Sequence, residues 1–202
     1  MKIDYILLKD HQLKGLEQLP TVFSHPEKNY SHYLSRMGIQ YLSKVLGALP
    51  PPLDKIELVD FQHIKALPGH IFSVSHTKDC ALVASAQAEK FKGIGVDIER
   101  VHRTIKVDSE KYFLNSDDSF QGSLLEKWCV KEACFKALSN SGEAIKLLQE
   151  AVVIDNNFYF KENPQSRKHN CYEIIKNQEH IFVIAYCGIG NSQVNLNSVN
   201  FI

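Results

Sequence analysis

The sequence has 202 residues, 44% of them hydrophobic and 23% charged, and its 23 basic and 23 acidic side chains cancel. Such a composition is typical of a globular protein of one large or two small domains and excludes wholesale disorder. The neutral balance argues against broad nucleic-acid binding, which needs a basic surface. No apolar run reaches the ~18 residues of a membrane-spanning helix. We therefore expect a protein that uses neither a membrane nor nucleic acid.

The five cysteines show no CxxC spacing. An odd number of cysteines without a pairing pattern is typical of free thiols in a reducing compartment. We therefore expect a cytoplasmic protein, and the cysteine spacing does not indicate a zinc site.

The first half of the chain predicts both strands and a helix. Residues 2–8, KIDYILL, predict a strand, and the apolar spacing within 29–47 predicts a helix that ends before the prolines at 50–52. Residues 55–61 predict a short strand, and 71–86 predict a hairpin that turns at the letters TKD.

The stretch KGIGVDIERV, residues 92–101, predicts a third consecutive strand. Three strands joined by short links favour an antiparallel meander. Within this stretch Ile94, Val96 and Ile98 alternate with Gly95, Asp97 and Glu99. One face of the strand is therefore apolar and the other is acidic.

The second half begins with a weakly helical stretch at 105–115, and residues 122–140 give the strongest helix signal. Ser123 and Glu126 have the spacing of a capping box, and Gly142 follows the helix end. Four strands are then predicted, at 150–154, 158–161, 171–176 and 180–187. The order indicates an α+β fold of two halves, 1–100 and 101–202, that meet near residue 100 with the functional site between them.

Asp97 and Glu99 would lie roughly 6.5–7 Å apart on one strand face. Two like charges at this separation raise each other's pKa unless a cation lies between them. A solvated strand face is the alternative explanation, since one face of an antiparallel sheet is commonly exposed.

A third acid lies on the packing side of the long helix. At 100° per residue, Glu132 falls inside an apolar arc between Trp128 and Leu125. It is either the partner of Lys136 in an i,i+4 ion pair or a member of a convergent acidic site. Three carboxylates suit a hard cation such as Mg²⁺, which usually bridges protein to substrate phosphates. Gly95 would then let a phosphate ester or pyrophosphate approach the backbone.

Three motifs occur in order: FSVSHT (72–77), GVDIE (95–99) and WCVKEACFK (128–136). Together they resemble the 4′-phosphopantetheinyl transferase superfamily, and the chain length resembles its two-domain, Sfp-like type. The resemblance covers residues 70–140. It implies a pseudo-dimer of two similar halves, each a small antiparallel sheet packed with a long helix. It also implies Mg²⁺-dependent transfer of 4′-phosphopantetheine from coenzyme A to a serine of an apo acyl or peptidyl carrier protein, with release of 3′,5′-ADP.

The resemblance also implies roles for individual residues. The metal, Mg²⁺ or Mn²⁺ in its place, would be held by Asp97, Glu99 and Glu132. Glu132 would also take the serine proton, and Lys136 would transfer a proton or stabilise charge. The residues expected to bind coenzyme A are Arg36, Ser75, His76 and Lys131.

The sequence departs from the family pattern before the hairpin. A GKP-type segment that supplies nucleotide contacts is replaced by FQHIKALPGHIF (61–72), where only Lys65 offers a substitute, and Thr77 stands where a serine is usual. Two other functions therefore stay open: a non-catalytic homologue that binds coenzyme A and docks on a carrier protein or synthase, and a purely structural α+β domain. We expect a monomer, because a pseudo-dimer completes its site within one chain.

Overall fold

The computed structural model describes residues 1–13, 26–49, 52–53, 56, 69–190 and 193–200, without the side chains of residues 10, 13 and 26–30. The predicted strand at 55–61, apart from Ile56, and the candidate Lys65 lie outside the described residues.

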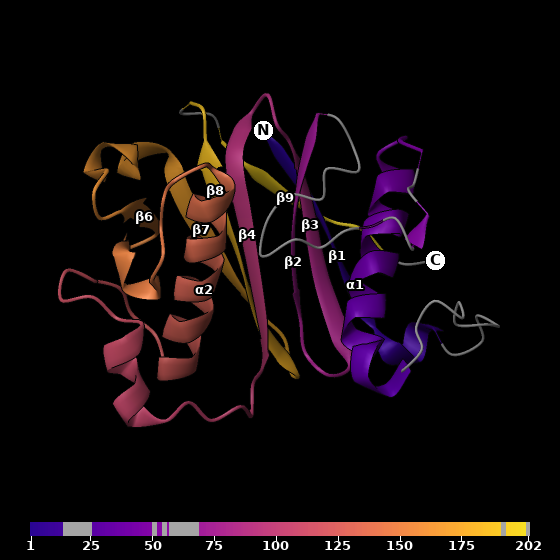
Figure 1. The fold of residues 1–202 in the computed structure, drawn as a ribbon, viewed down its shortest axis with the longest axis horizontal. Helices are drawn as coiled ribbons and strands as arrows, with labels where there is room; N and C mark the ends of the chain where they lie inside the picture. Colours follow the sequence, from indigo (N-terminus) through magenta and orange to yellow (C-terminus); the bar gives the residue numbers. More distant parts are fainter. Residues whose placement is uncertain (14–25, 50–51, 54–55, 57–68, 191–192, 201–202) are drawn as a thin grey trace.

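Two sheets pack between two long helices (Figure 1). In the first sheet the strand order is β2-β3-β1-β9, and in the second it is β4-β8-β7-β6-β5. The first sheet consists of β1 (Lys2–Lys9), β2 (His70–His76), β3 (Cys80–Gln87) and β9 (Asn195–Ser198). The second consists of β4 (Phe91–Arg100), β5 (Ala151–Ile154), β6 (Asn157–Phe160), β7 (Asn170–Lys176) and β8 (His180–Gly188). This is the α+β architecture that the sequence predicts.

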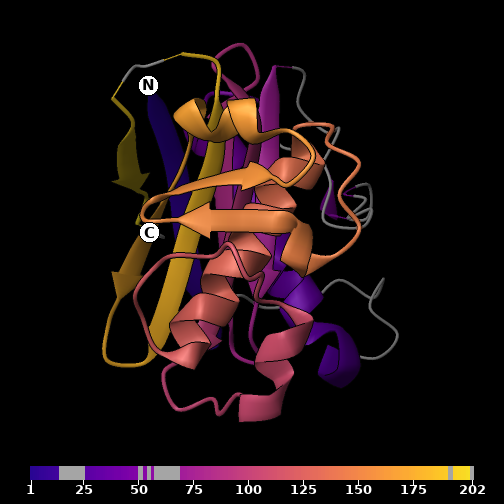
Figure 2. The same ribbon diagram turned by 90° about the vertical axis from the view of Figure 1, so that its left-hand side faces the viewer.

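Helix α1 (Pro26–Val45) covers the first sheet and α2 (Leu124–Asn140) covers the second. Figure 2 shows α2 on the outer face, with β5 and β6 lying across the direction of β8. Short 3₁₀ helices lie at η1 (Asp10–Leu13), η3 (Val107–Tyr112), η4 (Leu148–Glu150) and η5 (Pro164–His169). No helix in the described ranges has the length and apolar character needed to cross a bilayer.

The two halves have the same core topology. Strand β3 lies between β2 and β1 with antiparallel pairing on both sides, and β8 lies between β7 and β4 in the same way. Ion pairs cross between the halves in matching places: Lys9 at the end of β1 pairs with Glu179, and Arg100 at the end of β4 pairs with Asp79. This correspondence is compatible with the predicted pseudo-dimer.

The predicted meander is wrong in its third strand. β2 and β3 form the expected hairpin, but β4 leaves that sheet and pairs with β8, about ninety residues later in the chain. The polar strand β9, which the sequence did not predict, returns to the first sheet and pairs with β1 in parallel. Two strands therefore cross the predicted division at residue 100, and the change of sheet lies between Gln87 and Phe91.

The alternation within β4 serves two interfaces. Ile94, Val96 and Ile98 belong to the apolar core between the two sheets, where they meet Leu82, Phe182 and neighbouring side chains. The opposite face of β4 packs against α2, whose own core includes Cys129, Ala133 and Ala137. β4 is therefore buried on both faces. It ends where the chain reaches the exposed, charged Arg100, which a buried strand would not accommodate.

Glycine on β4 permits the close approach of α2. A Cβ atom on Gly93 would lie 2.2 Å from Ala137 O, and one on Gly95 would lie 2.0 Å from Ala133 O. The expectation that Gly95 makes room for a ligand is thus wrong, because the backbone of α2 already fills that space.

The start of α2 agrees with the predicted capping box. Ser123 Oγ accepts a hydrogen bond from Glu126 N, and the Glu126 carboxylate accepts one from Ser123 N. Gly142 follows the end of the helix at φ +91°, a conformation that glycine adopts without strain.

Candidate active site

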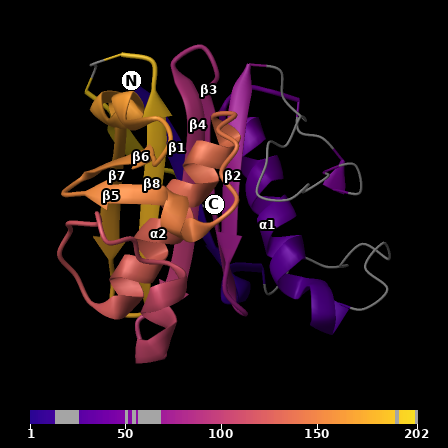
Figure 3. The same ribbon diagram turned by 60° about the vertical axis from the view of Figure 1, so that its left-hand side comes forward.

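The site is built on the free edge of β4, where the two sheets meet (Figure 3). Side chains form hydrogen bonds with the backbone groups of this edge that do not pair with another strand. Ser73 and Ser75 on β2 accept hydrogen bonds from Val96 N and Ile98 N at 3.0 and 3.3 Å. Lys136 on α2 donates to Val96 O at 3.0 Å. This edge is therefore covered by polar side chains from both halves, which places charged groups inside the protein.

Asp97 lies at the centre of this edge and is 5% exposed. Its Oδ1 atom accepts hydrogen bonds from Ser75 Oγ at 2.9 Å and Lys136 Nζ at 3.0 Å. Its Oδ2 atom is buried and has no hydrogen-bond partner among the residues that the structure describes, and the weakly donating Cys129 thiol lies beside the carboxylate. A buried carboxylate oxygen without a partner is costly, so this oxygen has the character of a ligand atom.

The exposure of the two acids on β4 excludes the solvated strand face considered above. Glu99 is only 8% exposed and pairs with Arg103, whose guanidinium also lies 5.6 Å from the centre of the Trp128 ring. Trp128 packs edge-on against Phe113 at 5.2 Å between ring centroids. Arg103 is therefore held between an acid of β4 and an aromatic ring of α2.

Glu132 is half-buried near Asp97, Lys136 and Arg103. Burial raises the pKa of this carboxyl above its ordinary value; the nearby Lys136 opposes this rise and Asp97 adds to it. Lys136 itself pairs with Asp97 on the neighbouring strand, so the i,i+4 pair considered from the sequence is not the contact that it makes.

A cleft of about 630 Å³ opens beside Asp97 and Glu99. Its wall combines serine, threonine and acidic side chains with a row of basic ones. The basic residues are His76, Lys78, Arg100, His102 and Arg103. A cleft with cations around a carboxylate pair is suited to a polyphosphate ligand.

Two of the residues expected to bind coenzyme A border this cleft, namely Ser75 and His76. Ser75 is buried and its hydroxyl is already bonded to Asp97 and to Ile98 N, so it orients the carboxylate. The His76 ring lies 5.0 Å from that of His32 on α1. Partial burial, with help from His32 and Lys136, lowers the pKa of His76, so the neutral imidazole prevails at pH 7.

Arg36 and Lys131 are not among the described residues that line the cleft. Arg36 Nε donates to Ile56 O at 3.2 Å from the middle of α1. Lys131 is 0% exposed and forms an ion pair with Asp118 at 2.8 Å. Its predicted contact with coenzyme A conflicts with this placement, because its ammonium group is enclosed and joins Asp118 to Ala151 O on β5.

The structure does not gather the three predicted metal ligands. The part of the chain that the structure describes contains one group of at least three His, Cys, Asp or Glu ligand atoms within 4.8 Å of one another, and that group does not include Asp97, Glu99 or Glu132. Instead, Lys136 and Arg103 occupy one oxygen of Asp97 and one of Glu99. The three acids lie in one region of the protein, and Lys136 and Arg103 form ion pairs with two of them.

Of the basic residues of the cleft, sequence reasoning found His76 and missed Lys78, Arg100, His102 and Arg103. Arg100, His102 and Arg103 directly follow the acidic strand, and this ERVHR cluster was the available signal. Lys78 lies in the turn of the β2–β3 hairpin and carried no comparable signal.

The fold and this site define a protein of two topologically matched α+β halves, with a buried carboxylate and a basic cleft at the seam between them. The model of the 4′-phosphopantetheinyl transferase superfamily matches residues 93–187, so this segment is a domain of that superfamily. The matched segment runs from β4 to β8 and includes α2. A search of the curated proteins found no match to the sequence. The superfamily supports phosphopantetheine transfer in general, and the Sfp-like subtype stays a prediction.

Proposed function

We propose that this protein transfers 4′-phosphopantetheine from coenzyme A to a serine of an apo carrier protein and releases 3′,5′-ADP. The observation that carries this proposal is the Asp97 carboxylate, which lies on the matched domain with an unpartnered buried oxygen beside a basic cleft. Coenzyme A joins a pyrophosphate to a 3′-phosphate, and the row of basic side chains suits both groups.

The donor set also fits the divalent metal that the superfamily typically uses. Asp97 Oδ2 would be the first ligand, and Glu99 and Glu132 are carboxylates in the same region, which is the oxygen chemistry that Mg²⁺ or Mn²⁺ prefers. When bound, the metal would neutralise pyrophosphate charge and polarise the phosphoryl group.

The protein's own residues orient the substrates. Ser75 and Lys136 fix Asp97 from two sides, so the carboxylate does not depend on ligand binding for its position. His76, His102 and Arg100 line the cleft, where they would contact the phosphates of coenzyme A.

Glu132 is the group suited to take the serine proton. Its raised pKa makes it a stronger base than an ordinary glutamate. As the serine oxygen forms a bond to phosphorus and the bond to the leaving 3′,5′-ADP breaks, the proton passes to Glu132. Lys136, one helical turn further on α2, would offset the negative charge that develops.

The test is the intact mass of a panel of apo carrier proteins after incubation with coenzyme A, Mg²⁺ and the protein. We expect at least one carrier to gain a phosphopantetheine group, and Glu132→Gln to abolish the gain with an unchanged circular dichroism spectrum. The matched control Glu162→Gln, an exposed acid beyond β6, should retain transfer. Full activity of Glu132→Gln would refute the assignment of the base.

A second function is favoured by the ion pairs of Lys136 and Arg103, which now occupy Asp97 and Glu99. A protein that keeps these pairs would bind coenzyme A without reacting and would dock on a carrier protein or synthase. Calorimetric binding of coenzyme A together with no mass gain on any carrier would favour that function.

A further inference from the structure

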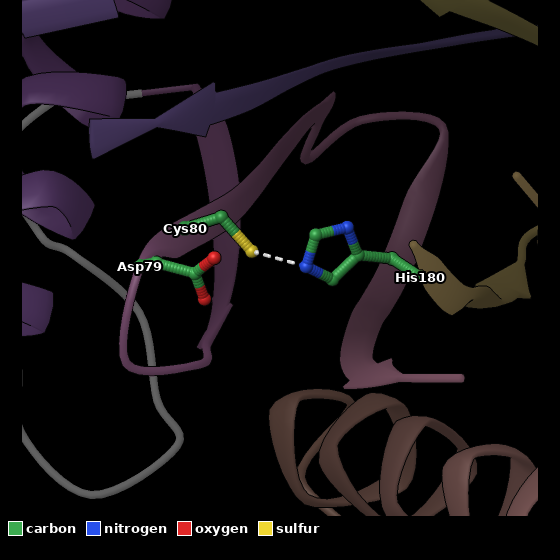
Figure 4. A group of neighbouring side chains, drawn as sticks. All are labelled: Asp79, Cys80 and His180. Atoms are coloured by element: carbon green, nitrogen blue, oxygen red, sulfur yellow. Dashed lines mark hydrogen bonds between the residues drawn. The ribbon is translucent and has the colours of Figure 1, made fainter. Parts of the chain in front are cut away.

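A second cluster of ligand-type side chains joins the two halves beside the end of β4, where His180 lies opposite Arg100. Asp79 and Cys80 come from the β2–β3 hairpin, and His180 begins β8 in the second sheet (Figure 4). Their ligand atoms all lie within 4.8 Å of one another, and Cys80 Sγ lies 3.3 Å from His180 Nε2. Cys80 and His180 occupy the same position in topologically matched hairpins, so the cluster lies where the halves meet.

The spacing of the sulfur and nitrogen atoms is close to that around a tetrahedral metal. Zinc bonds of about 2.3 Å to sulfur and about 2.05 Å to nitrogen place the two ligand atoms about 3.6 Å apart. The observed 3.3 Å needs only a few tenths of an ångström of movement. The Thr77 hydroxyl and the Arg100 guanidinium both bind Oδ1 of Asp79, which leaves Oδ2 to act as the third ligand.

The imidazole is the second observation that points to a ligand. His180 is 2% exposed, and its Nδ1 atom is buried without a hydrogen-bond partner in the described part of the chain. Its Nε2 atom contacts the thiol of Cys80, which is itself fully buried. The nearest carboxylate to Nδ1, that of Glu179 at 3.9 Å, is beyond hydrogen-bond distance and pairs with Lys9.

We propose that Asp79, Cys80 and His180 bind a thiophilic divalent metal such as Zn²⁺. The thiol loses its proton to solvent, and the fourth position opens on the side of the half-exposed Asp79. The ligand set of sulfur, nitrogen and one oxygen differs from the carboxylate set of Asp97, Glu99 and Glu132, so the two sites would select different metals. The site joins the two halves of the chain and does not depend on the proposed transfer reaction.

The experiment uses Co²⁺ as a spectroscopic probe on the full chain, stripped of metal, with excess Mg²⁺ to saturate the carboxylate site. We expect one equivalent of Co²⁺ to produce a thiolate-to-cobalt charge-transfer band, and one equivalent of Zn²⁺ to remove it. Cys80→Ser should abolish the band, and His180→Asn should weaken binding by more than tenfold. Cys171→Ser, which removes a half-buried cysteine of β7, should leave the band unchanged.

The wild-type titration decides the matter even if a variant fails to fold. No thiolate band at stoichiometric Co²⁺ would overturn the proposal and leave the Cys80–His180 contact as a hydrogen bond between halves. A band that persists in folded Cys80→Ser would assign the metal to another cysteine and would also overturn it. Zn²⁺ should in addition raise the melting temperature of the wild type but not that of Cys80→Ser.

Discussion

Replacing Gly95 by alanine tests how closely α2 must pack on β4 for the site to form. A Cβ atom at this position would lie 2.0 Å from Ala133 O and 2.5 Å from Ala137 N. Both neighbours are helix backbone atoms, so no side-chain rotation relieves the clash. Because Cβ atoms essentially never approach such atoms closer than 3.0 Å, the helix must move by about 1 Å.

That displacement acts on stability and on chemistry separately. Overpacking of a core costs about 1–3 kcal/mol of unfolding free energy. Glu132 and Lys136 move with the helix while Asp97 stays on the strand, and a displacement of about 1 Å can lower a rate by about 10²-fold. We expect Gly95→Ala to lower both the free energy of unfolding and the reaction rate. The loss in rate should persist at temperatures where the variant is fully folded.

Urea denaturation measures the stability, and carrier-modification rates at low temperature measure the chemistry. Gly190→Ala is the matched control, since a Cβ there would meet no atom of the described residues within 4 Å. If Gly95→Ala were as stable as the wild type, the close packing of α2 on β4 would be wrong. If it were unstable but fully active when folded, the position of α2 would not control the reaction.

Three further predictions follow from buried polar groups. Lys131→Met should lower the unfolding free energy by about 3–5 kcal/mol in urea, since it strands the buried Asp118, and adding Asp118→Asn should restore part of that loss. Ser75→Ala should cost about 1–3 kcal/mol by the same measurement, because Asp97 Oδ1 loses a donor and Ile98 N loses its acceptor. Since burial raises the pKa of Glu132, the metal-free protein should lose stability relative to Glu132→Gln as pH rises from 4.5 through that raised pKa; a pH-independent difference would contradict the shift.

The elements were predictable because their signals are local. The turn at TKD, the capping box at Ser123 and the alternation in β4 each lie within a few residues, and all three appear in the structure. The pairing of β4 with β8 was not predictable in this way, because it joins residues about ninety positions apart. β9 has the sequence NLNS, which carries no apolar alternation, so only its pairing with β1 identifies it as a strand.

The site was predicted in outline but not in its contacts. Asp97 and Lys136 form an ion pair, as expected for an acidic motif and a basic motif on two elements that pack together. Lys131 is expected near the site because it belongs to the WCVKEACFK motif, but that motif lies on a helix buried on most sides and does not tell which of its residues face β4 and which face β5. Arg103 was missed because its partners, Glu99 and Trp128, lie on two different elements.

The three-residue link between β3 and β4 has a consequence for how the protein responds to dilution. The edges of β2 and β4 that form the cleft belong to one chain, so the local concentration of one half around the other is set by this tether. An assembly of two separate chains would lose its seam at low concentration. We expect the specific activity of this protein to stay constant down to the lowest concentrations that an assay can follow.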